Sequence, residues 1–93
     1  MTDNVRHNEA MSRYELEAEG GLTVVEYHRQ GDILTITHTG TPPELQGKGL
    51  AGRLMKAVFE DVRRQGLKIV PQCSYVVAYL KRHPEEQDVV AAG

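Results

Sequence analysis

The hydrophobic pattern of this chain changes its period once, and that change limits what the chain can fold into. Up to about residue 40, apolar and polar residues alternate, as at Tyr14, Leu16 and Ala18, which charged residues separate. A period of two is typical of strands with one buried and one solvent-exposed face. From Gly49 onward the apolar residues lie three or four apart, which predicts one amphipathic helix. They are Ala51, Leu54, Met55, Val58, Phe59 and Val62.

Three strands are predicted before this helix, and short turns join them. Gly20-Gly21 and Gln30-Gly31-Asp32 are the turn signals. Because such short turns join antiparallel neighbours, we predict a β-meander. Its strands are expected at 13–19, 22–28 and 33–39, with a further short strand a candidate at 4–9. We expect its solvated face to carry Glu15, Glu17 and Glu19.

The second half of the chain predicts a helix, a parallel strand and a second helix. Gly66 is a natural stop for the first helix, and residues 67–71 read as a strand. Ser74 is placed to cap the second helix, and Pro84 to end it. We therefore predict an α+β fold in a single domain, 1–93. Its core spans about 12–84, and residues 85–93 are expected to be a flexible tail.

Composition limits the partners that this chain can be expected to have. It has 93 residues and a net charge of -2, so one small domain without affinity for nucleic acid or membrane is expected. No signal sequence or bilayer-spanning run is evident, so a cytoplasmic protein is the default expectation. The lone Cys73 cannot form an intramolecular disulfide, and the scattered histidines predict no metal site. We expect a monomer or weak dimer.

Residues 46–52, Gln-Gly-Lys-Gly-Leu-Ala-Gly, hold three glycines where the helix is expected to begin. Read literally, they match the G-x-G-x-x-G pattern of dinucleotide-binding domains. That pattern should follow a buried parallel strand and precede an acidic residue by about 20 positions. Here it follows an antiparallel meander and Pro42-Pro43. The strand after the helix, at 67–71, ends at Gln72 and Cys73 without a carboxylate. A nicotinamide or flavin site is therefore not expected.

Two interpretations of the glycine stretch remain. One is a loop whose glycines only allow the chain to turn. The other is an anion site, because the first amides of a helix lack internal partners and lie at its positive end. Residues 46–68 hold six Lys or Arg and two acids, whereas residues 1–45 hold three and eight. This basic block, with Lys48 at the rim, favours a site for a diphosphate, although a solvated basic helix face has the same composition.

The segment Gln46-Gly47-Lys48-Gly49-Leu50-Ala51 resembles the Q/R-x-x-G-x-G/A motif of the GNAT (GCN5-related) acyltransferase superfamily. The segment Pro71-Gln-Cys-Ser-Tyr-Val76 also resembles a minimal branch of GNAT-like N-acetyltransferases. The resemblance implies a mixed sheet in which strands 33–40 and 67–71 splay apart around coenzyme A. It places the pantetheine arm on the backbone of Thr39, Gly40 and Thr41. It places the pyrophosphate on Gly47, Lys48, Gly49, Leu50, Ala51 and Gly52, next to Gln46.

Two residues are the candidates for catalysis in such a site. Cys73 follows a strand and precedes a helix N-terminus, a position that favours a thiolate. The resemblance also places a functional cysteine there, which either accepts the acyl group or contacts the cofactor thiol; a plain core cysteine is the alternative. By resemblance, Tyr79 is the acid that protonates the CoA sulfur, although its place on an apolar stripe equally suits a core residue. His38 is expected on the inward face with Leu34 and Ile36, as a base or a buried structural histidine.

The resemblance implies acetyl-CoA or coenzyme A as the ligand and an amine as the acceptor. Longer family members build the acceptor pocket from helices and strands for which this chain has no room, so the acceptor is not predicted. Glu26 and His28, or the acidic strand face, are weak candidates for holding a cationic amine. The functional expectation is an acetyl-CoA-dependent N-acetyltransferase. The alternatives are a CoA-binding module without turnover and a β-rich scaffold with an incidental glycine loop.

Overall fold

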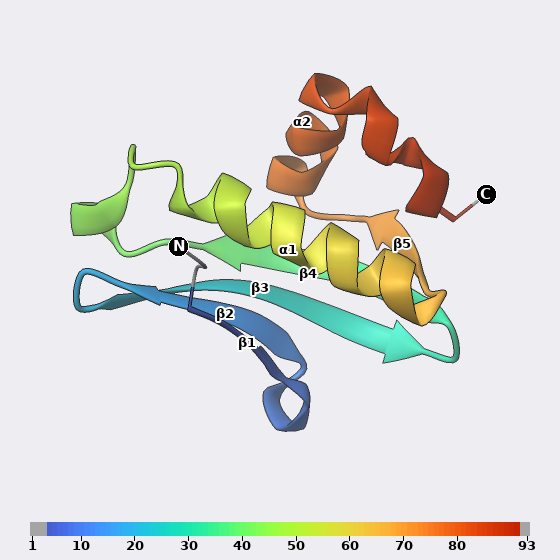
Figure 1. The fold of residues 1–93 in the computed structure, drawn as a ribbon, viewed down its shortest axis with the longest axis horizontal. Helices are drawn as coiled ribbons and strands as arrows, with labels where there is room; N and C mark the ends of the chain where they lie inside the picture. The colour runs from blue at the N-terminus through green and yellow to red at the C-terminus, as the bar shows by residue number, and fades with distance from the viewer. Residues whose placement is uncertain (1–3, 92–93) are drawn as a thin grey trace.

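A computed structural model describes residues 4–91, which form a five-stranded sheet covered on one face by two α-helices (Figure 1). The strands lie across the sheet in their order along the chain. They are β1 (Val5–Asn8), β2 (Arg13–Ala18), β3 (Gly21–Gln30), β4 (Ile33–Gly40) and β5 (Lys68–Pro71). The α-helices are α1 (Leu50–Gln65) and α2 (Ser74–Arg82). Three short 3-10 helices are η1 (Glu9–Met11), η2 (Pro43–Leu45) and η3 (Pro84–Val89).

The predicted order of elements is confirmed. Strands β1 to β4 pair antiparallel, and β5 lies parallel to β4 after the crossover through α1. The turn between β2 and β3 is made by Glu19 and Gly20, both with positive φ, which is the conformation of a tight type I′ hairpin. The candidate strand at 4–9 is β1, an edge strand that pairs with β2.

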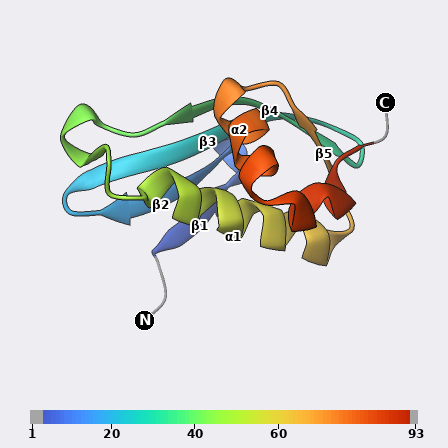
Figure 2. The same cartoon turned by 90° about the horizontal axis from the view of Figure 1, so that it is seen from above.

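The core lies between the sheet and the helices, both of which pack on the same face (Figure 2). The apolar stripe predicted for α1 is buried, and the helix ends as predicted at Gly66, whose φ is 73°. Helix α2 crosses above α1, and the rings of Phe59 and Tyr79 lie 5.3 Å apart. Of the two α-helices within residues 4–91, neither has the length and apolarity to cross a membrane.

Residues 85–91, the described part of the tail predicted at 85–93, are packed on the rest of the fold. Helix η3 follows α2, Val89 is buried, and the Ala91 amide donates to the Ile69 carbonyl at 2.9 Å on the free edge of β5. Arg63 of α1 donates to Glu86 Oε1 and Asp88 Oδ1, both at 2.7 Å. The polar composition of this segment suggested a loose end, but its acids are partners of a basic residue on α1. Residues 92–93 lie outside the described part.

The acidic face of β2 is not a uniformly solvated face. Glu15 is buried, and its carboxylate accepts hydrogen bonds from Arg13 and Asn8 at 2.7 and 3.0 Å, with the Arg6 guanidinium 3.1 Å away. The hydrogen bonds from Arg13 and Asn8 hold the pKa of Glu15 below its usual value. Glu17 accepts a hydrogen bond from Asn4. These carboxylates therefore already have partners, which weakens the idea that they attract a cationic acceptor.

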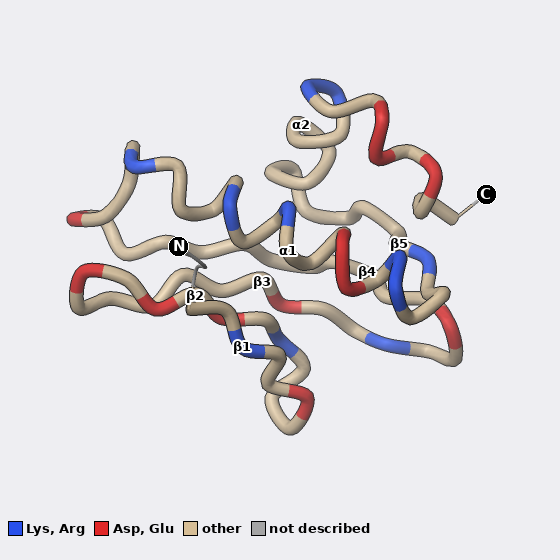
Figure 3. The backbone as a smooth tube through the Cα atoms, viewed as in Figure 1, with Lys and Arg blue, Asp and Glu red and all other residues tan. Residues whose placement is uncertain are grey.

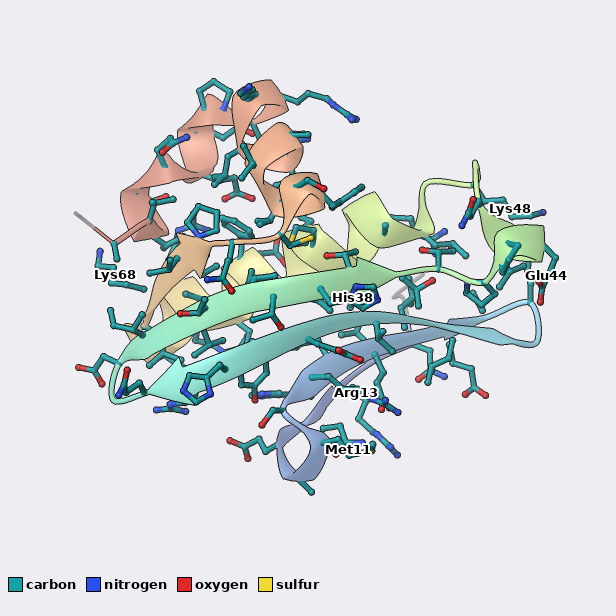
Figure 4. All side chains as sticks on the ribbon, turned by 180° about the vertical axis from the view of Figure 1, so that it is seen from behind. Met11, Arg13, His38, Glu44, Lys48 and Lys68 are labelled. Carbon is teal, nitrogen blue, oxygen red and sulfur yellow. The ribbon has the colours of Figure 1, made fainter. Side chains whose placement is uncertain are left out.

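A bulge in β4 overturns the predicted inward position of His38. Glu26 pairs with His38 but the next residue, Tyr27, pairs with Ile36, so Thr37 is an extra residue. A bulge inserts one residue and reverses the alternation that follows it. His38 is consequently exposed on the face without helices (Figure 4), while Thr39 pairs with the buried Val25 and points to the helix side.

Candidate functional site

The glycine stretch forms the loop that leads into α1. Gly47 and Gly49 have φ values of 84° and 76°, a left-handed conformation that costs other residues energy, and Gly49 is the N-cap of α1. The first helical hydrogen bond runs from the Arg53 amide to the Gly49 carbonyl at 3.1 Å. The amides before it have no partner within the helix and lie at its positive end. The loop therefore presents amides rather than side chains to an approaching anion.

A pocket of about 320 Å³ opens at this helix end, and we call it the glycine pocket. It lies on the helix side of the sheet, between the end of β4, η2 and the N-termini of α1 and α2. Among the described residues that line it, none is charged. Its lining is Thr39, Thr41, Leu45, Gln46, Gly47, Gly49, Leu50, Ala51, Gly52 and Tyr75.

Most of the predicted cofactor-binding residues meet in this pocket. Eight of them line it, whereas Gly40 and Lys48 do not. The Lys48 ammonium lies 3.1 Å from the Glu19 carboxylate at the tip of the β2–β3 hairpin, on the loop seen at the end of the sheet in Figure 4. The rim charge expected from Lys48 is thus paired, and the site depends on backbone amides. The role of these residues in binding stays a prediction.

The loop 41–49 is held in place by contacts at both ends. Leu45 of η2 is buried against Gly21, where even a Cβ atom would come within 2.4 Å of the leucine side chain. The Gln46 side-chain amide donates to the Thr41 carbonyl at 3.2 Å. A side chain at position 21 would therefore displace Leu45, and Gln46 supports the loop that forms the pocket wall.

Strands β4 and β5 separate immediately beside the glycine pocket. Their pairing runs from Ile33 with Lys68 to Ile36 with Pro71. Beyond it, the Ile36 carbonyl accepts from the amides of both Gln72 and Cys73, at 3.2 and 3.0 Å. The chain then turns into α2, which leaves the end of β4 unpaired on this side. The splay expected between residues 33–40 and 67–71 is therefore present.

Cys73 lies at the point where the two strands separate. It is the N-cap residue of α2, so the predicted cap at Ser74 is wrong by one position. Its sulfur lies 3.6 Å from Thr39 Oγ1, and Thr39 lines the glycine pocket. Burial raises the pKa of the Cys73 thiol, but hydrogen bonds from Thr39 and from the Val76 and Tyr75 amides outweigh it, so the pKa lies below its usual value. Cys73, next to the pocket, therefore forms a thiolate more readily than an ordinary cysteine does.

Tyr79 does not reach the glycine pocket. Its ring is buried against Phe59 and His83, and its hydroxyl donates to Glu86 Oε2 at 3.2 Å. Burial and the neighbouring Glu86 carboxylate raise its pKa. Tyr79 therefore holds its proton and directs it toward η3 rather than toward Cys73.

Tyr75 is a candidate that the sequence reasoning missed. It is half-buried in the first turn of α2 and lines the glycine pocket, and its hydroxyl would lie 3.5 Å from a Cβ atom placed on Gly52. Tyr75 precedes Tyr79 by four residues, so both lie on one side of α2. That spacing, together with its position two residues after Cys73, was the available signal.

Comparisons with known proteins agree with this geometry. A family model described as GCN5-related N-acetyltransferase matches residues 13–89. Protein NATD1 from Mus musculus is 29% identical over 86 residues, which cover 89% of this chain and 78% of that protein. Protein NATD1 from Homo sapiens is 34% identical over 55 residues, 59% of this chain and 49% of that protein.

A solved structure has the same fold. The NMR solution structure of a GCN5-like protein from Staphylococcus aureus superposes with a TM-score of 0.74 at 29% sequence identity. The superposition covers 100% of this chain and 93% of that one. The α+β architecture predicted from the sequence is therefore confirmed.

The environment of Cys73 predicts an unusually reactive thiol. Alkylation of this single cysteine by iodoacetamide, followed by mass spectrometry across pH, should have its midpoint below that of an ordinary thiol, about 8.5. Thr39→Val removes a hydrogen bond to the thiolate and should move the midpoint upward. The urea-unfolded protein is the control and should titrate as an ordinary thiol. A midpoint at or above that control in the folded protein would contradict the assignment.

Gly52 should show a trade-off between stability and binding. It lies inside α1 without positive φ, and a Cβ atom there meets only the Tyr75 hydroxyl, at an ordinary contact distance. Gly52→Ala should therefore raise the free energy of unfolding by about 0.5–1 kcal/mol through helix propensity. The added methyl narrows the pocket floor, so binding of coenzyme A should weaken severalfold.

The matched control for this variant is Gly66→Ala, at the other end of α1. Gly66 has φ of 73°, so alanine should destabilise the fold by about 1 kcal/mol and leave binding unchanged. Urea unfolding and calorimetric titration measure the two effects. If Gly52→Ala binds coenzyme A as tightly as the wild type, Gly52 does not form part of the binding surface.

Proposed function

We propose, because the chain belongs to the GCN5-related N-acetyltransferase family, that it binds acetyl-CoA and transfers the acetyl group to an amine. The observation that carries the proposal is the glycine pocket. It joins the free amides at the start of α1 to Thr39, whose hydroxyl lies beside the Cys73 sulfur. A ligand with a diphosphate at one end and a thioester at the other suits such a pocket.

The residues present fit this donor substrate in three ways. The amides of residues 47–52 suit its diphosphate, and the glycines allow close approach. The unpaired end of β4, from Thr39 to Thr41, offers backbone groups to its amide-containing arm. Cys73 does not itself line the pocket, but its sulfur lies 3.6 Å from Thr39 Oγ1, at the end of the pocket where the thioester belongs. When bound, the donor supplies an acetyl group on a good leaving group.

In this proposal Cys73 acts as the nucleophile. The Cys73 thiolate attacks the acetyl carbonyl, the bond from that carbon to the CoA sulfur breaks, and CoA leaves as a thiolate. A neutral amine then attacks the S-acetyl carbonyl, the bond from that carbon to the Cys73 sulfur breaks, and the Cys73 thiolate is free again. The proton that the amine loses passes through solvent to the CoA thiolate, which completes the CoA thiol. Amides at the N-terminus of α2 stabilise the negative charge on the sulfur at both ends of this cycle.

The alternative is a module that binds coenzyme A without turnover. The observation that favours it is the position of Tyr79, whose hydroxyl bonds to Glu86 rather than facing the glycine pocket. With this orientation, the Tyr79 hydroxyl is not directed at the sulfur of the departing CoA. Tyr75, which lines the pocket, is the tyrosine placed to take that role instead.

Acetyl transfer is tested in two steps with wild-type protein and two variants. Intact-mass measurement after incubation with acetyl-CoA alone should show one acetyl group on the wild type. Cys73→Ala should remain unmodified, since it lacks the nucleophile, while still binding coenzyme A. Tyr79→Phe should be acetylated like the wild type, because its hydroxyl faces Glu86. Adding a panel of primary amines should then discharge the acetyl group and yield the acetylated amine.

Three outcomes separate the alternatives. Acetylated amine from the wild type but not from Cys73→Ala supports the transferase with a cysteine nucleophile. Equal product from both proteins would mean direct transfer and would remove Cys73 from the chemistry. Binding of coenzyme A without product from any amine would leave the binding module as the function.

A further inference from the structure

A second pocket of about 290 Å³ adjoins the glycine pocket on its α1 side. Gly49, Gly52 and Tyr75 line both pockets, so the two are continuous over the first turn of α1. The lining of the second pocket continues along α1 and to the end of α2. We call it the basic pocket, after Arg53, Lys56, Arg82 and His83.

The two pockets differ sharply in charge. The described lining of the glycine pocket has no charged side chain, whereas that of the basic pocket has three cationic residues and no acid. Figure 3 shows Lys and Arg on the first half of α1 and at the end of α2. Two helices that are separate in the sequence thus direct positive charge to one surface depression.

Two of these cations lack the carboxylate partners that other basic residues have. Lys48 pairs with Glu19, and Arg63 with Glu86 and Asp88. Lys56 and Arg82 are exposed, and within residues 4–91 neither forms an ion pair. His83 Nδ1 lies 3.3 Å from the Glu85 carboxylate, and the His83 ring lies tilted to the Tyr79 ring with the centroids 4.4 Å apart. The positive charge of Lys56 and Arg82 is therefore available to a ligand.

We infer that the basic pocket binds the 3′-phosphate of coenzyme A, an inference that rests on the proposed function. Coenzyme A carries a diphosphate and, on its ribose, a separate phosphomonoester. With the diphosphate on the amides at the start of α1, the ribose end extends toward the neighbouring pocket. Lys56 lies one helical turn beyond Gly52, about 6 Å along the axis. Lysine and arginine side chains are the usual partners of a phosphomonoester.

The position of Cys73 argues against an acidic acceptor as the occupant. An acceptor must reach the thioester, which belongs near Cys73 and Thr39. Thr39 and Thr41 line the glycine pocket and not the basic pocket. The basic pocket therefore lies at the end of the binding surface away from the chemistry, where the nucleotide part of the donor belongs.

The test compares coenzyme A with 3′-dephospho-coenzyme A by calorimetric titration at one fixed, low ionic strength. Wild-type protein should bind coenzyme A roughly tenfold more tightly, as expected for contacts to partly exposed cations. The double variant Lys56→Gln/Arg82→Gln should reduce this ratio to about one, with dephospho-coenzyme A bound as by the wild type. Lys81→Gln is the matched control, because it removes one charge from α2 outside the basic pocket.

The outcomes distinguish this inference from the proposed function. A tenfold ratio that is lost in the double variant and kept in Lys81→Gln supports it. Equal affinity of the wild type for both ligands would leave the glycine pocket as the CoA site but overturn the role of the basic pocket. A ratio that survives in the double variant would also overturn it. If neither ligand binds the wild type, the proposed function fails, and this inference fails with it.

Discussion

The extra residue at Thr37 in β4 decides which side chains reach the site. Without it, the alternation that buries Leu34 and Ile36 would place His38 on the helix side. With it, Thr39 faces the helices and contacts the Cys73 sulfur, while His38 faces solvent. The same region is where β4 loses its pairing with β5, because the Ile36 carbonyl accepts from both Gln72 and Cys73. The bulge thus places Thr39 in the pocket, and the end of the β4–β5 pairing places Cys73 beside it.

Backbone amides and charged side chains contribute to different parts of the proposed binding surface. At the start of α1, amides and glycines form a neutral lining, and the loop's own lysine is held by Glu19 on the neighbouring hairpin. Side-chain charge appears one helical turn later, in the basic pocket. A long ligand with phosphate groups at two places would use both kinds of contact. Its uncharged end would then lie toward Cys73, where helix α2 begins.

The sequence predicts the parts of this protein that local pattern determines. The hydrophobic period predicts the apolar stripe from Leu54 to Val62, and the left-handed preference of glycine predicts the helix end at Gly66. The glycine stretch predicts an anion site, because the first amides of a helix have no partner within it. Features that depend on a neighbouring element were missed. The bulge at Thr37 is a property of pairing, Glu15 is buried by arginines of β1 and β2, and Arg63 holds η3 through Glu86. The direction of the Tyr79 hydroxyl likewise depends on Glu86.

The most direct measurement of the central claim is an NMR titration of the uniformly ¹⁵N-labelled protein with coenzyme A. The largest amide shifts should occur at residues 46–52 and at Thr39 and Thr41, and all of them should saturate with a single dissociation constant. The amide chemical shifts of β1 and η1 should not change, because β1 lies at the opposite edge of the sheet from β5. If the amide shifts of residues 46–52 do not change at a saturating concentration of coenzyme A, the glycine pocket is not the CoA site, even if other amides shift.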